Sequence, residues 1–161
     1  MRRLRAAAGS VLFLAVAPGV VGGLVPWLLT GWHSADPPRW LQVVGWAVFA
    51  SGAVALLEAF GRFVFEGIGT PAPVAPTEKL VVGGLYRYVR NPMYLAVAAM
   101  ILGQAAVLGR WVLVACAVVF GAIVWSFVHW YEEPTLRRRF GADYEAYLRT
   151  VPGWWPRLGR G

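Results

Sequence analysis

The sequence predicts an all-α fold: a polytopic membrane protein with four transmembrane helices, of which the last two form a C-terminal helical hairpin, followed by an interfacial tail helix. Of the 161 residues, 58% are hydrophobic and 14% are charged, whereas a soluble domain carries about a quarter charged residues. The apolar residues form runs long enough to cross a bilayer. A very short turn joins the last two runs, so these two helices are expected to pack antiparallel.

Charge and rare residue types exclude several classes of function. The net charge of +7 comes mostly from arginine. In a membrane protein such an excess marks cytoplasmic loops and lipid headgroups rather than nucleic acid. The single cysteine, Cys116, lies inside an apolar run, which argues against a disulfide framework or a cysteine metal cluster. His33 and His129 are far apart in sequence and form no ligand pair. We therefore expect no metal and no nucleic-acid partner.

The first predicted helix covers residues 6–29. The basic start of the chain resembles a signal peptide, but the apolar run is longer than a typical signal segment and ends without a clear small-residue cleavage site. We therefore expect an uncleaved transmembrane helix with a kink near Pro18. Its glycines and prolines suit a membrane helix, because neighbouring helices can satisfy the backbone groups that they free.

The second predicted helix covers residues 40–60, after a short polar loop. Gly45 and Gly52 are spaced to form a face for close helix packing. Glu58 precedes Arg62 by one helical turn, which is the favourable order for an ion pair. Two interpretations stay open: a contact at headgroup level, or a polar group in a substrate cavity, since acids within membranes are often functional.

Residues 61–82 form the longest segment without an apolar run, and their prolines favour an extended path over a regular helix. A long ordered loop beside a membrane is often functional, although a simple connector fits this segment equally well. The stretch that follows is polar, basic and aromatic, and it runs directly into the next apolar helix.

The hairpin consists of two predicted helices, residues 92–108 and residues 111–131, joined by a tight turn at Gly109. Asn91 lies 18 residues before Gly109, and Glu132 lies 23 residues after it. At about 1.5 Å per residue, both return to the same face of the membrane, offset by roughly 7 Å along the axis. The start of one helix and the end of the next are therefore expected to face one shallow cavity.

The start of the hairpin has the features of a capped helix and of an anion site. Asn91 is a strong N-cap residue because its side-chain oxygen can accept from free N–H groups, and Pro92 suits the first helical position. The positive end of the helix dipole faces a basic, aromatic segment, which makes a candidate anion site. Its side chains are Arg87, Tyr88 and Arg90. Gln104, in mid-helix, is expected to hydrogen-bond within the bundle.

After the hairpin, Pro134 is expected to restart the chain as an interfacial helix, which Gly141 breaks in two. The basic residues set the orientation, because with four helices almost all of them fall on one side of the membrane. We therefore expect an integral, multi-pass membrane protein with both termini in the cytoplasm.

Two sequence blocks together carry a resemblance. Residues 84–94 read GLYRYVRNPMY, and residues 132–147 read EEPTLRRRFGADYEAY and are followed by Val151 and Pro152. In this order, and separated by a helical hairpin, the blocks resemble the superfamily of isoprenylcysteine carboxyl methyltransferases and phospholipid methyltransferases. The resemblance covers residues 78–156, about half of the chain.

This resemblance implies an integral membrane methyltransferase that uses S-adenosyl-L-methionine, bound on the cytoplasmic side, and a lipophilic acceptor that enters from the surrounding membrane lipids. Residues 1–66 would supply the first two helices, and residues 67–161 the cofactor-binding part, of one membrane domain. The cofactor contacts that it implies are Lys79, Leu80, Val81, Tyr86, Asn91, Pro92, Met93, Tyr94, Glu132 and Glu133. The catalytic residues that it implies are Glu132, Arg90 and Asn91.

The chemistry of this cofactor agrees with the residues. A helix N-terminus with Arg90 nearby suits its carboxylate, and Glu132 suits its ammonium group or a ribose hydroxyl. Aromatic rings can cover the adenine or face the sulfonium by a cation–π contact. The candidates for this are Tyr86, Tyr94, Trp154 and Trp155.

Two positions depart from the family pattern, and two other classes of function stay open. Asn91 stands where many members have histidine. Val128 stands where the prenylcysteine enzymes have an arginine that holds the substrate carboxylate, so the acceptor is left open. The alternatives are an NADPH-dependent membrane reductase of the sterol-reductase type, which has a related C-terminal architecture, and a non-enzymatic membrane scaffold.

Overall fold

The computed structural model describes residues 16–67 and 78–157 of the chain, and the secondary structure of these residues is helical. The α-helices are α2 (Val25–Thr30), α3 (Arg39–Arg62), α4 (Pro92–Leu108), α5 (Trp111–Phe127), α6 (Glu133–Phe140) and α7 (Ala142–Thr150). Short π-helical turns cover Val20–Leu24, Phe63–Gly67 and Val128–Glu132, and a 3₁₀ turn covers Gly84–Arg87. The predicted all-α class is confirmed for this part of the chain.

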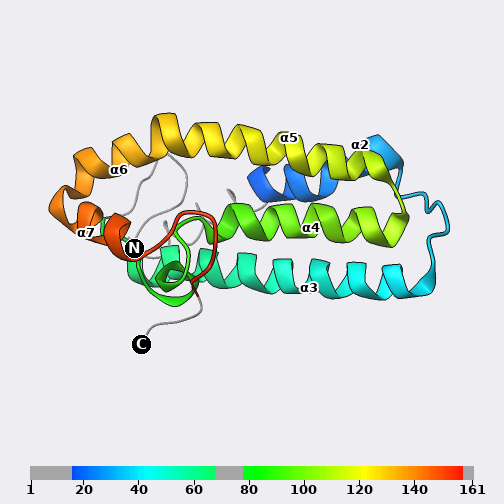
Figure 1. The fold of residues 1–161 in the computed structure, drawn as a ribbon, viewed down its shortest axis with the longest axis horizontal. Coiled ribbons are helices and arrows are strands. Elements are labelled where there is room, and N and C mark those ends of the chain that lie inside the picture. The colour runs from blue at the N-terminus through cyan, green and yellow to red at the C-terminus, as the bar shows by residue number, and fades with distance from the viewer. Residues whose placement is uncertain (1–15, 68–77, 158–161) are drawn as a thin grey trace.

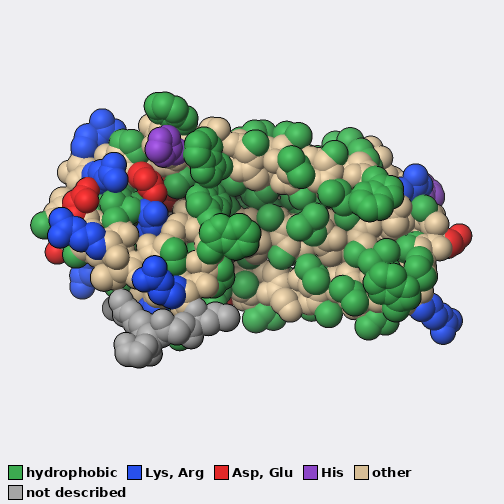
Figure 2. Space-filling model, in the orientation of Figure 1, with side chains coloured by type: hydrophobic (Ala, Val, Ile, Leu, Met, Phe, Trp, Pro, Cys, Tyr) green, Lys and Arg blue, Asp and Glu red, His purple; other side chains and the backbone are tan. Residues whose placement is uncertain are grey.

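The helices form an elongated bundle. In Figure 1, α3, α4 and α5 run along its length, α2 lies beside α4 and α5, and α6 and α7 close one end. Two helices are long and apolar enough to cross a membrane, Arg39–Glu66 and Trp111–Phe140, and two shorter apolar helices accompany them, Val16–Thr30 and Pro92–Leu108. On the face drawn in Figure 2, hydrophobic side chains cover the length of the bundle, and charged side chains gather at the end of α6 and α7.

Helices α3 and α4 approach each other closely through glycines. A Cβ atom on Gly45 would lie 2.7 Å from the Gly103 carbonyl oxygen, and one on Gly103 would lie 2.7 Å from the Gly45 carbonyl oxygen. Two helical turns further along α3, a Cβ on Gly52 would lie 2.8 Å from the Ala96 carbonyl oxygen. The predicted packing face of Gly45 and Gly52 is confirmed, and small residues allow it because they let the two backbones approach.

The N-terminal helix and α4 are joined by a side chain that bonds to a backbone carbonyl freed by a proline. Pro26 of α2 has no N–H, so the carbonyl of Gly22, four residues earlier, loses its helical donor. Gln104 of α4 donates to that carbonyl oxygen at 2.6 Å. The expectation that Gln104 bonds within the bundle is confirmed. Residues 6–15 of the first predicted helix lie outside the described residues. Val16–Thr30 is helical, and the kink near Pro18 stays a prediction.

Helix α3 is longer than the sequence predicts. It begins at Arg39 and continues through the π turn Phe63–Gly67, so the prediction of a non-helical connection from residue 61 is wrong for residues 61–67. In these turns Arg62 pairs with an acid one turn before it and another one turn after it, Glu58 and Glu66, and both acids also bond to backbone amides of the following loop. The segment that follows, residues 68–77, lies outside the described residues.

The second long helix runs from α5 into α6 without a break. The prediction that the chain restarts at Pro134 is therefore wrong. A π turn makes this continuity possible. The Glu133 N–H donates to the Val128 carbonyl five residues back, so the backbone hydrogen-bond pattern of the helix shifts by one residue just before the proline. The helix does end at Gly141, whose φ of 52° is left-handed. The predicted break at that residue is confirmed.

Candidate functional site

The two ends of the helical hairpin meet through two side-chain contacts. The Tyr94 hydroxyl, in the first turn of α4, donates to Glu132 Oε2 at 2.8 Å. Arg90, just before α4, donates from Nη1 to Glu133 Oε1 at 2.7 Å, and both of these side chains are only 17% exposed. The prediction that the start of one helix and the end of the next lie at one face is confirmed.

The loop before α4 delivers Tyr86 to the interior. The 3₁₀ turn Gly84–Arg87 places the Tyr86 ring against Phe63 of the extended α3, edge-on, with 5.7 Å between ring centroids. The Tyr147 hydroxyl of α7 donates to the Tyr86 carbonyl oxygen at 2.6 Å. Tyr86 is 5% exposed, and α3, α7 and its own loop together fix its position.

Asn91 occupies the predicted N-cap position, with Pro92 as the first residue of α4, but its side chain does not cap the helix. Its Nδ2 instead donates to the Gly153 carbonyl oxygen at 3.0 Å. The prediction of a side-chain cap is therefore wrong, because the C-terminal tail brings a carbonyl that uses the amide as a donor. The neighbouring Arg90 N–H donates to Pro152 O at 2.9 Å, so the tail is bound to this loop at two consecutive residues.

A cavity of about 830 Å³ lies between these elements. One end is lined by polar and charged side chains, and the rest is lined almost entirely by apolar ones. The polar end comprises Tyr86, Arg90, Asn91, Tyr94, Glu132 and Glu133. The apolar walls come from the N-terminal helix, α4 and α5, among them Val21, Val25, Val97, Val119 and Ile123.

Most of the residues predicted for the site share this cavity. Those that line it are Leu80, Val81, Tyr86, Arg90, Asn91, Met93, Tyr94, Glu132 and Glu133. Lys79 is exposed and Pro92 is buried, and neither belongs to the walls that the described residues form. The predicted anion site is brought together only in part. Arg90 reaches the cavity, whereas Arg87 and Tyr88 are exposed outside it.

The predicted aromatic cover is also only partly assembled. Tyr86 and Tyr94 line the cavity, and Trp154 lies beside Tyr94 with 6.4 Å between ring centroids. Trp155 is 84% exposed. The Glu58–Arg62 pair is confirmed at 2.8 Å, and its residues are not among the described walls of the cavity.

Sequence analysis missed several wall residues. They are Phe60, Phe63, Thr135, Leu136, Arg139, Phe140, Tyr144 and Tyr147, whereas Val128, which also lines the cavity, was singled out as a departure from the family pattern. Leu136 and Phe140 are four residues apart, and Tyr144 and Tyr147 are three apart, so each pair lies on one face of a helix. This spacing is the sequence signal that could have identified these four wall residues. Phe63 gave no such signal, because it belongs to the part of α3 that was expected to be loop.

Two buried polar atoms at the charged end have no hydrogen-bond partner among the described residues: the Tyr86 hydroxyl and Arg90 Nε. Buried polar groups are normally satisfied, so such orphaned atoms are candidates for ligand contacts. Burial raises the pKa of Tyr86 well above its ordinary value, and the Glu132 carboxylate raises it further. Tyr86 is therefore a neutral hydroxyl that can donate or accept at physiological pH.

Two other tyrosines at this end also stay neutral. Burial raises the pKa of Tyr144 to about 12, and the nearby Glu133 carboxylate adds to the shift while Arg90 opposes it. Burial likewise raises the pKa of Tyr147, again against the effect of Arg90. The formal charges that line this end of the cavity are thus those of Arg90, Glu132, Glu133 and Arg139.

Comparisons with known proteins match the part of the chain that carries both hairpin ends. The model of the phospholipid methyltransferase family matches residues 40–143, which is more than half of the chain and includes both hairpin ends. A protein-S-isoprenylcysteine O-methyltransferase from Schizosaccharomyces pombe is 35% identical over 80 residues, a region that is 48% of this chain and 33% of that relative. The match thus spans about a third of the relative's length. No solved structure matches the chain.

Proposed function

This chain belongs to the phospholipid methyltransferase family, and we propose that it transfers a methyl group from S-adenosyl-L-methionine to a lipophilic acceptor within the membrane. One observation carries the proposal. A single cavity joins a charged end, formed where the two ends of the hairpin meet, to a long apolar arm between helices. A polar methyl donor and an apolar acceptor need these two environments side by side.

The charged end fits the donor in its arrangement of groups. The donor carries an ammonium and a carboxylate, and the cavity offers the Glu132 carboxylate and the Arg90 guanidinium. Arg90 uses Nη1 for Glu133 and keeps a buried Nε without a partner in the described structure, so it can still donate to an anion. The orphaned Tyr86 hydroxyl suits a ribose hydroxyl or the purine edge. Glu132 would hold the ammonium, and the Tyr94 bond fixes the orientation of its carboxylate.

When bound, the donor would supply an electrophilic methyl group on a sulfonium. The residues of the chain would then bind and orient the two reactants and exclude water from the site. These effects account for much of the barrier reduction in transfers that need little covalent help. The aromatic faces of Tyr86 and Tyr94 are suited to a cationic sulfur. No proton has to be removed from an acceptor that is already anionic, and a general base is needed only for a poor nucleophile.

The apolar arm defines the class of acceptor. One wall, formed by α5 and the π turn that follows it, reaches from Val112, beside the Gly109 turn, to Glu132 at the charged end. These 21 residues of continuous helix place its two ends about 30 Å apart at 1.5 Å per residue. The opposite wall includes Leu29 and Val25 of α2. An amphiphile with one long apolar chain would place this chain in the arm and its reactive polar atom at the charged end.

The same arrangement supports an orientation in the membrane. The charged end carries Arg62, Arg87, Arg90 and the run Arg137 to Arg139, whereas the opposite end carries Arg39 and Arg110. The side of a membrane protein that is richer in arginine and lysine faces the cytoplasm. We therefore place the donor site at the cytoplasmic face, where the soluble donor is accessible to it.

A transfer assay tests this function. The purified protein in lipid nanodiscs is incubated with S-adenosyl-L-methionine labelled on its methyl group and with a membrane lipid extract, and the label is followed into the organic phase. We expect an organic-soluble labelled product that the Glu132→Gln variant does not form. A thermal-shift comparison with NADPH runs beside it. Stabilisation by NADPH without any by S-adenosylhomocysteine, together with no labelled lipid, would contradict the proposal.

A further inference from the structure

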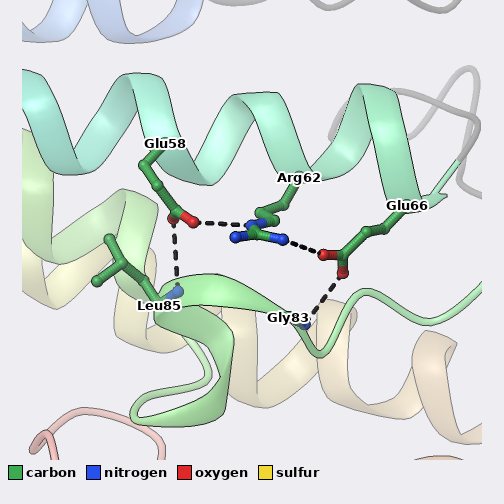
Figure 3. A network of polar contacts seen from close by, with 5 residues as sticks. All are labelled: Glu58, Arg62, Glu66, Gly83 and Leu85. Carbon is green, nitrogen blue, oxygen red and sulfur yellow. Dashed lines mark hydrogen bonds and ion pairs between the residues drawn. The ribbon is translucent and has the colours of Figure 1, made fainter.

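A network of charged side chains at the end of α3 is bonded to the loop that carries Tyr86 (Figure 3). Arg62 donates from Nε to Glu58 Oε1 at 2.8 Å and from Nη1 to Glu66 Oε1 at 2.5 Å. The other oxygen of each acid accepts from the loop backbone. The Gly83 N–H donates to Glu66 Oε2 at 3.0 Å, and the Leu85 N–H lies 3.4 Å from Glu58 Oε2. Arg62 thus holds two carboxylates in the positions that bind two loop amides.

The glycines of this loop are explained by the same contacts. A Cβ atom on Gly83 would overlap the carboxylate of Glu66, and one on Gly84 would overlap Glu58 and Arg62. Gly84 also has a φ of +55°, in the left-handed region that favours glycine. The backbone can therefore lie directly on the acids only because these two residues lack side chains.

The network lies next to a cavity residue without lining the cavity itself. Leu85, one of its two backbone partners, directly precedes Tyr86, and Phe63 of the same helix end packs on the Tyr86 ring. Ala59, one residue after Glu58, is fully buried in the cluster that contains Tyr86. The end of α3 therefore contacts the backbone of Gly83 and Leu85, on the N-terminal side of Tyr86, and also the Tyr86 ring, whose orphaned hydroxyl faces the cavity.

We propose that Arg62, Glu58 and Glu66 are positioning residues for the donor site, which set the place of Tyr86 through the Gly83–Leu85 backbone. This role rests on the proposed function, because the donor gives the placement of Tyr86 its purpose. Arg62 is the central member, since it lies between the carboxylates of Glu58 and Glu66, which without it would repel each other above the same loop (Figure 3). Loss of this guanidinium is therefore expected to release both amide contacts together.

The variants are designed to separate positioning from folding. Arg62→Met removes the charge and keeps an apolar chain of similar reach. Arg62→Lys keeps the charge but not the planar fork that contacts two acids at once. Arg149→Met is the matched control, because Arg149 is an exposed arginine of α7 at the same end of the bundle and lies outside the cavity walls.

Two readouts are measured in nanodiscs: the dissociation constant of S-adenosylhomocysteine, and amide hydrogen exchange of residues 83–87 without ligand. Arg62→Met should weaken binding about tenfold, the effect expected when hydrogen bonds to a charged group are lost, with Arg62→Lys between it and the wild type. Exchange in residues 83–87 should become faster while that of α4 and α5 stays unchanged. The thermal midpoint should move little, because exposed ion pairs contribute little to stability.

The outcomes distinguish the two proposals. If the wild-type protein binds S-adenosylhomocysteine and Arg62→Met binds it equally well, or if Arg149→Met weakens binding as much as Arg62→Met does, the positioning role is wrong and the proposed function stands. If the wild type binds none, the proposed function fails. If Arg62→Met loses binding only in proportion to a loss of folded protein, with uniform exchange across the chain, the role is structural and the proposal is overturned.

Discussion

The Tyr94 hydroxyl donates a 2.8 Å hydrogen bond to Glu132 Oε2, and so joins the first turn of α4 to the last residue before α6. Both residues line the cavity. The bond therefore fixes an acidic group at the point where the polar end of the cavity begins, and several consequences can be measured.

Replacing Tyr94 by Phe removes the donor and leaves the ring. A hydrogen bond to a charged group contributes roughly 1.5–3 kcal/mol, so we expect the dissociation constant of S-adenosylhomocysteine to rise by about tenfold or more. Tyr88→Phe is the control, since Tyr88 is exposed outside the cavity. Isothermal titration calorimetry in detergent gives both values. Equal binding by the Tyr94→Phe variant and the wild type would show that the bond does not orient Glu132 for the ligand.

The Gln104 side chain should stabilise the bundle only because Pro26 frees a carbonyl. Gln104→Leu leaves the Gly22 carbonyl without its 2.6 Å donor and should lower the thermal midpoint, since an unsatisfied buried polar group costs about 1–3 kcal/mol. In a Pro26→Ala background a backbone N–H is restored, and the same change should cost less. Thermal unfolding of the four proteins forms a double-mutant cycle. Additive changes in the thermal midpoint would show that the contribution of Gln104 does not depend on Pro26, which contradicts the prediction.

The α3–α4 contact should tolerate no added side chain at Gly45. Its Cβ would lie 2.7 Å from backbone atoms of Gly103 and Val107, and overpacking of this kind costs about 1–3 kcal/mol. Gly45→Ala is therefore expected to lower the thermal midpoint clearly. Gly121→Ala is the matched control on α5, where nothing lies within 4 Å of the added atom. Helix propensity alone would raise the midpoint of both variants, because alanine favours a helix over glycine. A midpoint that does not fall in Gly45→Ala, or that falls equally in both variants, would therefore contradict the role of the contact.

A change in the apolar arm should affect binding of the acceptor and leave binding of the donor unchanged. Val118 and Val119 are both exposed on α5, but only Val119 lines the cavity. We expect Val119→Trp to raise the KM for a lipid acceptor severalfold while leaving S-adenosylhomocysteine binding unchanged, because the larger ring occupies the arm. Val118→Trp should change neither value. An unchanged acceptor KM in the Val119 variant would place the acceptor elsewhere.

The hairpin and its geometry could be predicted because local signals and run lengths decide them. Pro92 marks the start of α4 and Gly109 its end, at the bounds that the sequence predicts, and the lengths of the two runs then return Tyr94 and Glu132 to the same end of the hairpin. The length of α3 could not be predicted in the same way. Its last turns contain glycines and charged residues and no long apolar run, and their acids bond to backbone amides 17 and 27 residues further along the chain.

Long-range partners also explain the other errors. The Asn91 side chain has the right chemistry for a cap, but a carbonyl from the tail, 62 residues later, uses its amide instead. Pro134 would normally begin a new helix, and only the π turn before it lets the helix continue. Local propensity describes each residue correctly in these cases, and tertiary contacts choose among the conformations that it allows.

Glu132 is the acidic group on which the proposed donor site depends most directly. The decisive measurement is the dissociation constant of S-adenosylhomocysteine for the wild type, for Glu132→Gln and for Asp143→Asn, an exposed acid of α7 outside the cavity. We predict that the wild type binds, that Glu132→Gln binds at least tenfold more weakly because a charge-assisted contact is lost, and that Asp143→Asn matches the wild type. Absence of binding by the wild type, or equal binding by all three proteins, would contradict the account.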